Sequence, residues 1–222
     1  MTTPQACPSS LTSPAAILRV QGLRFAYPQQ AALFADWSAR IPAGVSLVRG
    51  GESSGKTTLL RLLAGALPAQ AGQLQIHGIS LDAQPDVYRQ HVFWADPRTD
   101  IHDQTTVLDY WSLLRARYAS FDPGILGGLL EGLSLTEHQH KPLYMLSTGS
   151  KRKVWLAGAF ASGAALTLLD EPFAALDTGS IRFVLQLLAN EAAKHYPARA
   201  WVVTHYEALG EVPLAGTINL GD

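Results

Sequence analysis

A glycine- and serine-rich stretch is the first part of the chain whose residue types and spacing suggest chemistry. It runs from Gly50 to Thr57 and has the eight-residue spacing of a phosphate-binding P-loop. Glycines let successive backbone N–H groups point at phosphate oxygens, and a helix that follows adds its positive N-terminal dipole. We expect Lys56 to bridge two phosphates and Thr57 to bind Mg²⁺. The candidate nucleotide-binding residues here are Gly50, Gly51, Glu52, Ser53, Ser54, Gly55, Lys56, Thr57 and Thr58.

Two adjacent acids follow an apolar run at residues 166–169. As a strand of a buried sheet, this run would bring Asp170 and Glu171 to its carboxyl end, where open α/β sheets bind ligands. Asp170 is then placed to hold Mg²⁺, directly or through water, and Glu171 to orient and deprotonate an attacking water. Because the glutamate directly follows the metal-binding acid, the pair favours hydrolysis of a nucleoside triphosphate over kinase transfer.

The elements that must position these residues alternate along the chain. Apolar runs predict strands over 17–27, 33–41, 45–48, 74–76, 92–94, 166–169, 200–203 and 217–220. One-face spacing of apolar residues predicts helices after residue 55 and over 107–118, 123–133, 151–162 and 179–194. Continuous apolar strands separated by amphipathic helices are typical of a buried parallel sheet. The fold class is therefore α/β, with a helical insert in the middle of the chain.

These motifs, together with others along the chain, resemble the ATP-binding subunit of ABC transporters. Leu146-Ser147-Thr148-Gly149-Ser150 is similar to that family's signature loop and precedes the acidic motif Leu169-Asp170-Glu171-Pro172. The resemblance runs from about Ile17 to Leu220. It implies a P-loop NTPase of the ABC-cassette type, with a mainly parallel sheet core, an N-terminal antiparallel β portion and a helical insert at about 98–150.

The resemblance also implies roles for single residues. In the family the signature loop contacts the γ-phosphate of ATP held by a second copy, which assigns that contact to Ser147 and Gly149 at a helix N-terminus. Asp177 lies in a stretch similar to the loop that crosses the dimer interface. His205 resembles the switch histidine that reaches the γ-phosphate. Tyr27 has the place of the aromatic residue that stacks on adenine.

Two motifs depart from the family's pattern. The family usually has a glutamine after the strand that enters the helical insert, where it contacts Mg²⁺ and the transmembrane partner, and this chain has Asp96. Asp96 keeps an oxygen ligand for the metal but cannot donate a hydrogen bond as a carboxylate. In the signature loop, Thr148 replaces the usual first glycine and Ser150 the usual glutamine. These departures bear on coupling and turnover more than on nucleotide binding.

Composition limits the remaining alternatives. The chain has 222 residues, the size of one domain, and we expect a disordered leader at 1–14 followed by one ATP-binding domain at 15–222. Its net charge of -1 argues against a surface devoted to nucleic acid. Cys7 is the only cysteine, so a reducing cytosol fits best. No apolar run predicts a membrane span. The basic run at 151–153 is interpreted as electrostatic support for ATP.

The expected function is that of an ATP-hydrolysing subunit of an ABC transporter, peripheral on the inner face of the cell membrane. ATP and Mg²⁺ are the expected cofactors, and the expected partners are a second copy of the chain and a separate transmembrane permease. Two alternatives stay open: a soluble ABC-type ATPase acting on DNA or ribosomes, and a switch that binds ATP and hardly hydrolyses it. The sequence does not determine the transported substrate, although the stretch from Asp170 to Phe173 is somewhat similar to the ATPase subunit of haem exporters.

Overall fold

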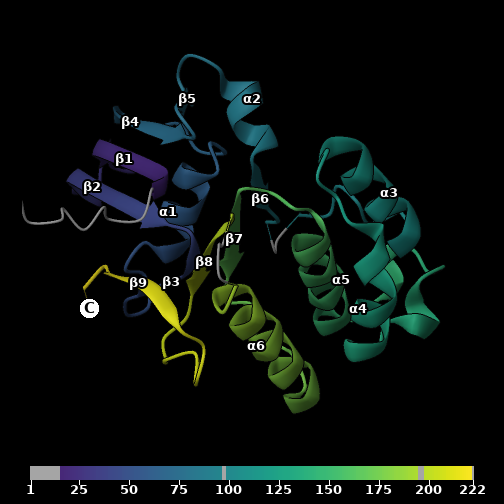
Figure 1. The fold of residues 1–222 in the computed structure, drawn as a ribbon. Coiled ribbons are helices and arrows are strands. Elements are labelled where there is room, and N and C mark those ends of the chain that lie inside the picture. The colour runs from purple at the N-terminus through teal and green to yellow at the C-terminus, as the bar shows by residue number, and fades with distance from the viewer. Residues whose placement is uncertain (1–15, 97–98, 195–197, 222) are drawn as a thin grey trace, which may run out of the picture.

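The structure is a computed structural model that describes residues 16–96, 99–194 and 198–221 (Figure 1). The leader expected at 1–14 lies outside these residues. The strands are β1 (Ala16–Phe25), β2 (Phe34–Pro42), β3 (Gly44–Arg49), β4 (Ala71–Ile76), β5 (Ile79–Ser80), β6 (Val92–Trp94), β7 (Leu166–Asp170), β8 (Ala200–Thr204) and β9 (Leu214–Asn219). The α-helices are α1 (Lys56–Leu63), α2 (Pro85–Gln90), α3 (Val107–Arg117), α4 (Leu126–Gly132), α5 (Thr148–Ala161) and α6 (Thr178–Ala192).

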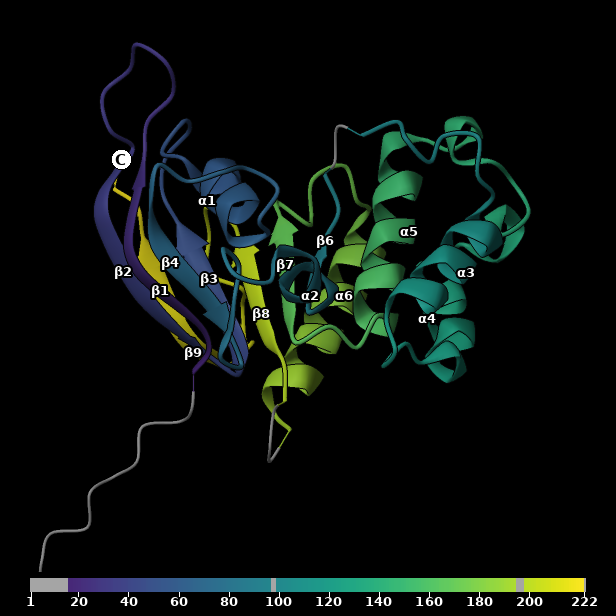
Figure 2. The same cartoon turned by 90° about the horizontal axis from the view of Figure 1, so that it is seen from above.

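Two sheets organise the chain. A five-stranded sheet with the order β6-β7-β8-β3-β9 is parallel throughout. A four-stranded antiparallel sheet with the order β2-β1-β4-β5 contains the N-terminal strands. In Figure 2 the antiparallel sheet and the helices α3, α4 and α5 lie at opposite ends of the molecule, with the parallel sheet between them. The expected α/β fold with a mainly parallel core and an antiparallel portion is confirmed.

Helix α1 lies between the two sheets. Its buried leucines, such as Leu59 and Leu63, share one hydrophobic core with β1, β4 and one face of the parallel sheet. The alternate side chains of the parallel strands, such as Leu47, Leu169 and Val203, pack on the other face with α5 and α6. Because both faces of the parallel sheet are covered, successive residues of its strands are apolar, which explains their continuous apolar runs in the sequence.

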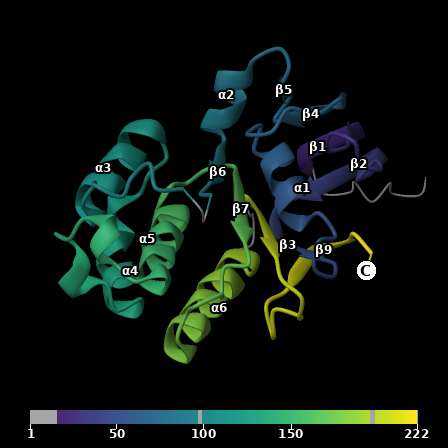
Figure 3. The same ribbon diagram turned by 180° about the vertical axis from the view of Figure 1, so that it is seen from behind.

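The insert helices pack on one another beside the parallel sheet, away from the antiparallel sheet (Figure 3). The indole N–H of Trp111 on α3 donates a hydrogen bond to the Val154 carbonyl on α5, with a length of 3.2 Å. Close packing also needs Gly158 on α5, because a Cβ there would lie 2.5 Å from Leu114 Cδ1. These contacts make α3 and α5 one packed unit. Among the residues described, no helix combines the length and apolar character that crossing a membrane requires.

Element boundaries differ from the sequence expectation in several places. Helix α5 begins at Thr148 rather than Lys151, because the Ser147 hydroxyl accepts a hydrogen bond from the Ser150 N–H and caps the helix. Strand β9 begins at Leu214 rather than Thr217, since its pairing with β3 extends to Val45. The short α2 and β5 were not expected, because six and two residues are too few to show a clear period.

Candidate functional site

The P-loop joins β3 to α1 and closes around its own lysine. The Lys56 ammonium donates hydrogen bonds to the carbonyl oxygens of Gly50 (2.8 Å) and Gly51 (2.9 Å). Two loop residues have left-handed backbones, Ser53 with φ 62° and Gly55 with φ 93°. At Gly55 a side chain would also lie 2.8 Å from Leu33 Cδ2, so glycine is required there on both grounds. The loop therefore holds a cation beside its backbone, as phosphate binding requires.

A cavity of about 540 Å³ opens over this loop. Its lining comes from residues 53–58 of the loop and α1, and from the turn between β1 and β2, including Tyr27 and Leu33. The Tyr27 hydroxyl is 3.0 Å from Thr58 Oγ1, and its ring meets Phe25 edge to face at 4.9 Å between ring centres. The volume is in the range of sites for small ligands, about 300–1,000 Å³. The structure thus places Tyr27 beside the P-loop.

The loop also carries a polar group that a phosphate would satisfy. The Ser54 hydroxyl, in the wall of the cavity, is buried and has no hydrogen-bond partner among the described residues. Buried polar groups without a partner are unfavourable, so such a hydroxyl fits an anionic acceptor. Glu52 and Ser53, at the tip of the loop, are exposed. The residues present therefore fit a nucleoside triphosphate.

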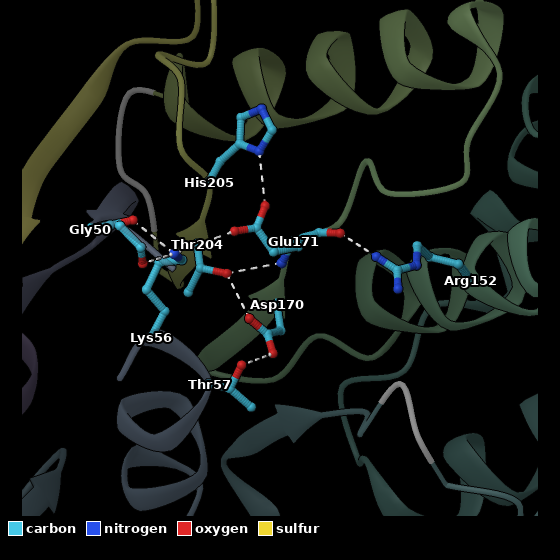
Figure 4. A network of polar contacts seen from close by, with 9 residues as sticks. Gly50, Lys56, Thr57, Arg152, Asp170, Glu171, Thr204 and His205 are labelled. Carbon is cyan, nitrogen blue, oxygen red and sulfur yellow. Dashed lines mark hydrogen bonds and ion pairs between the residues drawn. The ribbon is translucent and has the colours of Figure 1, made fainter. Parts of the chain in front are cut away.

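The parallel sheet brings Asp170 to the P-loop. Asp170 ends β7 and is in register with Thr204 at the end of β8. Thr57 donates its hydroxyl hydrogen to Asp170 Oδ2 at 2.7 Å, and Thr204 donates to Asp170 Oδ1 at 2.8 Å (Figure 4). Hydroxyl and carboxylate oxygens are the hard ligands that Mg²⁺ prefers. No group of three or more His, Cys, Asp or Glu side chains suited to a metal occurs among the described residues.

Glu171 has an unusual backbone, with φ 42° in the left-handed region. Such a conformation costs about 1–3 kcal/mol outside glycine and persists where surrounding contacts hold it. Its N–H donates to Thr204 Oγ1 at 2.9 Å. Its carbonyl oxygen accepts hydrogen bonds from the Ala174 N–H at 3.1 Å and from Arg152 Nη1.

The carboxylate of Glu171 lies between two basic groups. Oε2 is 3.1 Å from His205 Nδ1, and Oε1 is 3.8 Å from Lys56 Nζ. The side chains of His205 and Lys56 are 15% and 13% exposed, whereas that of Glu171 is 35% exposed. Figure 4 shows the three converging at the end of β7. A partly exposed carboxylate beside a largely covered ammonium is suited to take a proton from a water that attacks a phosphate held there.

Ser147, Gly149 and Asp177 form a second group. Ser147 caps the N-terminus of α5, and Asp177 caps that of α6 by accepting a hydrogen bond from the Ser180 N–H at 2.9 Å. A Cβ at Gly149 would lie 2.3 Å from the Ala175 carbonyl oxygen, so the start of α5 needs glycine to approach that backbone. The signature loop and the loop before α6 are therefore packed together within one copy of the chain.

The three basic residues expected to support ATP each have a separate partner. Lys151 pairs with Asp103 at 2.6 Å, and Lys153 pairs with Asp177 at 2.6 Å. Arg152 donates to the Glu171 carbonyl. The run therefore links α5 to three other segments of the chain, which the sequence interpretation did not foresee.

Asp96 lies two residues beyond the end of β6 and is half-buried. Trp94 is in register with Leu168, so Asp96 and Asp170 each follow this paired level by two residues. Its carbonyl accepts a hydrogen bond from the Thr99 N–H at 3.1 Å. Asp96 is therefore at the same edge of the sheet as Asp170, and its role toward Mg²⁺ stays a prediction.

Residues 35–174 match the sequence pattern of the ABC transporter family. The chain belongs to the ABC transporter family. It is 32% identical over 183 residues to the cytochrome c biogenesis ATP-binding export protein CcmA of Pseudomonas savastanoi pv. phaseolicola, covering 82% of this chain and 84% of CcmA. It is also 32% identical over 145 residues to the ABC transporter ATP-binding protein YtrB of Bacillus subtilis, covering 65% of this chain and 49% of YtrB.

Solved structures of ABC transporter proteins share the fold. An ATP-binding subunit of an ABC transporter superposes with a TM-score of 0.75 at 23% identity, covering 85% of this chain and 79% of the other. A putative ABC transporter ATP-binding protein from Pyrococcus furiosus superposes with a TM-score of 0.72 at 22% identity, covering 91% of this chain and 96% of the other. This ABC cassette is an ATP-binding, ATP-hydrolysing transporter subunit, as its sequence predicts.

Two residues of the ABC cassette's site have contacts that the sequence analysis missed. The sequence analysis assigned no role to Thr204, yet its hydroxyl connects Asp170 with the Glu171 N–H. Its position directly before the histidine and opposite Asp170 in a parallel sheet was the available signal. Arg152 gave no such signal, because only the packing of α5 beside β7 brings it to Glu171.

Proposed function

We propose that the ABC cassette hydrolyses Mg·ATP with Glu171 as general base and drives a membrane transporter as one of two ATPase subunits. The observation that carries this proposal is the 2.7 Å contact of Thr57 with Asp170, because it joins the P-loop to the acidic end of β7. Thr57 and Asp170 would hold Mg²⁺, with Asp96 as a further oxygen donor. Residues 50–58 would hold the phosphates, and Tyr27 would stack on adenine.

Each group has a defined part in the reaction. Bound Mg²⁺ would neutralise charge on the β- and γ-phosphate oxygens. Lys56 would leave the Gly50 and Gly51 carbonyls to hold the same phosphates. Glu171 takes a proton from water while the water oxygen forms a bond to the γ-phosphorus, and the bond from that phosphorus to the bridging oxygen of ADP breaks. His205 keeps the Glu171 carboxylate oriented and reaches the γ-phosphate.

Two substitutions separate binding from hydrolysis. Glu171→Gln should bind a fluorescent ATP analogue as wild type does, while kcat falls by about 10²–10⁴, the usual contribution of a general base. Lys56→Ala should weaken nucleotide binding itself. A Glu171→Gln variant that released phosphate at the wild-type rate would exclude Glu171 as the base. A wild-type protein that bound ATP without turnover, alone and with its membrane partner, would favour an ATP-dependent switch.

A second copy would complete each site. Ser147 and Asp177 are exposed at the N-termini of α5 and α6, where N–H groups and the helix dipole attract anions. In the proposed dimer, Ser147 and Gly149 contact the γ-phosphate bound to the P-loop of the other copy, and Asp177 lies at the interface. ATP then joins the copies, and its hydrolysis separates them.

A transmembrane permease on a separate chain would dock on the insert near Asp96, on the inner face of the membrane. Three large apolar side chains are exposed there, Ile101 (77%), Tyr144 (54%) and Met145 (59%). The segments are adjacent, since the Tyr144 N–H donates to the Asp103 carbonyl at 2.9 Å. Because the CcmA relatives are named export proteins, we propose export as the direction.

Co-purification tests the permease partner. The wild-type chain extracted from membranes in mild detergent should bring a membrane protein with it, and Ile101→Asp combined with Met145→Glu should lose that protein while retaining the ATPase activity of the isolated chain. Val87→Asp, at an exposed apolar residue of α2, is a matched control that should retain the partner. Recovery of the chain with ribosomes or DNA, and with no membrane protein, would contradict the proposal and favour a soluble ATPase.

A further inference from the structure

Arg152 connects the helix of the signature loop to the backbone of the proposed general base. It lies in the second turn of α5, and its Nη1 donates a hydrogen bond to the Glu171 carbonyl oxygen (Figure 4). Its Nε–H is buried and has no hydrogen-bond partner among the described residues. The Nη1 contact therefore joins α5 directly to the backbone of Glu171.

Two opposing effects act on the charge of Arg152. Burial lowers the pKa of Arg152, and the nearby carboxylates of Asp170 and Glu171 act in the opposite direction. The guanidinium contacts the carbonyl oxygen of Glu171 rather than either carboxylate, so it acts on the backbone of that residue.

The backbone of Glu171 is the feature on which Arg152 acts. With φ 42° this residue is in a conformation that needs support from its surroundings. Thr204 supports its N–H from β8, the Ala174 N–H supports its carbonyl from the following turn, and Arg152 supports the same carbonyl from α5. Of these three, only Arg152 belongs to the helix that begins at the signature loop.

We propose that Arg152 is a positioning residue through which the signature helix controls the general base of its own copy. Ser147 and Arg152 are on one rigid helix, about 7.5 Å apart along its axis at 1.5 Å per residue. Helix α5 is packed with α3 through Trp111, so a shift of its N-terminal part would be shared with the insert. When α5 is drawn into place at its N-terminus, Arg152 holds the Glu171 backbone; when α5 moves away, the carboxylate loses its alignment with the attacking water.

This inference rests on the proposed function and adds a link between the two sites of the dimer. The signature loop of one copy would contact the ATP of the other copy. Binding of ATP at that second site would therefore fix the position of the Glu171 backbone in the first site through Arg152. Each copy hydrolyses its own ATP efficiently only while the signature loop at the start of its α5 contacts the ATP of the other copy.

Steady-state kinetics of three variants, with ATP binding measured on the same samples, test the proposal. Arg152→Met should lower kcat by about 10- to 100-fold, since a displacement of about 1 Å can cost that much, while KM and the affinity for the ATP analogue change less than about twofold. Arg152→Gln keeps an N–H donor and should recover part of kcat. Arg115→Met removes the same charge at an exposed residue of the neighbouring helix α3 and should keep kcat near wild type.

A double-mutant comparison separates positioning from a general structural effect. In the Glu171→Gln background, adding Arg152→Met should lower the residual kcat by less than about twofold, because Arg152 acts only through Glu171. A further fall in kcat of about 10- to 100-fold in the Glu171→Gln background would overturn the inference. So would a kcat of the single variant Arg152→Met within about twofold of wild type. If Arg152→Met does not fold, the same comparisons with Arg152→Gln decide. Absence of turnover in wild type would instead count against the proposed function.

Discussion

At the scale of single residues, the site depends on one hydroxyl that serves two acids. Thr204 Oγ1 donates to Asp170 and accepts from the Glu171 N–H, so it fixes both the side chain that we propose binds Mg²⁺ and the backbone of the proposed general base. Thr204 is fully buried. A buried hydroxyl with both of its functions satisfied is costly to remove, because each partner is left without its hydrogen bond.

Thr204→Val should therefore affect stability and turnover together. The shape is kept, but the Glu171 N–H and an oxygen of Asp170 lose their partner, which should lower the free energy of unfolding by about 1–3 kcal/mol. We expect kcat to fall by at least tenfold while ATP binding persists. Urea unfolding and phosphate release measure the two effects. Thr204→Ser keeps the hydroxyl and should stay near wild type in both; equal losses in the Ser and Val variants would contradict this role.

Asp177 provides a prediction about pH. The hydrogen bond from Lys153 Nζ, followed by those from the Ser180 N–H and hydroxyl, lowers the pKa of Asp177 below its ordinary value. Because this pKa is lower in the folded chain than in the unfolded one, the stabilisation is complete above the unfolded value of about 3.9 and is lost as the pH falls through that value toward the folded pKa. An NMR titration of the carboxyl group should show the lowered pKa.

Lys153→Met is the matched variant for that titration. It leaves both hydrogen bonds from Ser180 in place and removes the ammonium that lies 2.6 Å from Asp177. The pKa of Asp177 should then rise toward its ordinary value. A pKa of about 3.9 in the wild-type protein, or one that does not respond to the substitution, would show that this ion pair does not form in solution.

At the scale of elements, the sequence predicted the helices, strands and loops that short residue patterns determine. The strand, glycine loop and helix over residues 44–63 were expected because their order alone makes a P-loop. The helices predicted from apolar spacing over 107–118 and 151–162 correspond to α3 and α5, although α5 begins three residues earlier than predicted. The contact of Arg152 with Glu171 could not be predicted, since it depends on how α5 packs beside β7. The left-handed backbone of Glu171 was equally invisible, because glutamate seldom adopts it.

The C-terminal end of α5 shows another such tertiary contact. The Arg199 guanidinium, just before β8, donates to the carbonyl oxygens of Ala159 (2.9 Å), Phe160 (3.1 Å) and Ala164 (2.8 Å). It lies 4.5 Å from the ring centre of Trp201. Burial lowers the pKa of Arg199 to about 10. Arg199 therefore ties the end of the signature helix to the parallel sheet, where the last helical carbonyls need donors.

Arg199→Met should loosen this end of α5. The substitution removes the donors to several buried carbonyls and should lower the free energy of unfolding by about 2–4 kcal/mol. Urea denaturation should show a lower midpoint with an unchanged slope. Arg199→Lys keeps the charge with fewer donors and should lose less. A midpoint for the Met variant equal to that of wild type would show that the helix end is held by other contacts.

At the scale of the whole molecule, the parallel sheet is what assembles the site. The carboxyl ends of β3, β7 and β8 meet at one edge, which brings together the P-loop, Asp170 with Glu171, and Thr204 with His205. The antiparallel sheet contributes Tyr27 from the turn after β1. Ser147 and Gly149 begin a different element, the helix α5, and would serve a second copy. The proposed mechanism is therefore a property of two molecules.

Light scattering of the Glu171→Gln variant, with phosphate release followed on the same sample, tests the central claim most directly. The account predicts that the mass doubles from 23.9 kDa when Mg·ATP is added and that almost no phosphate is released. Wild type should release phosphate and stay largely monomeric. Adding Lys56→Ala to Glu171→Gln should abolish the dimer. Phosphate release by Glu171→Gln at the wild-type rate, with no change in mass, would contradict the claim that Glu171 hydrolyses ATP held between two copies.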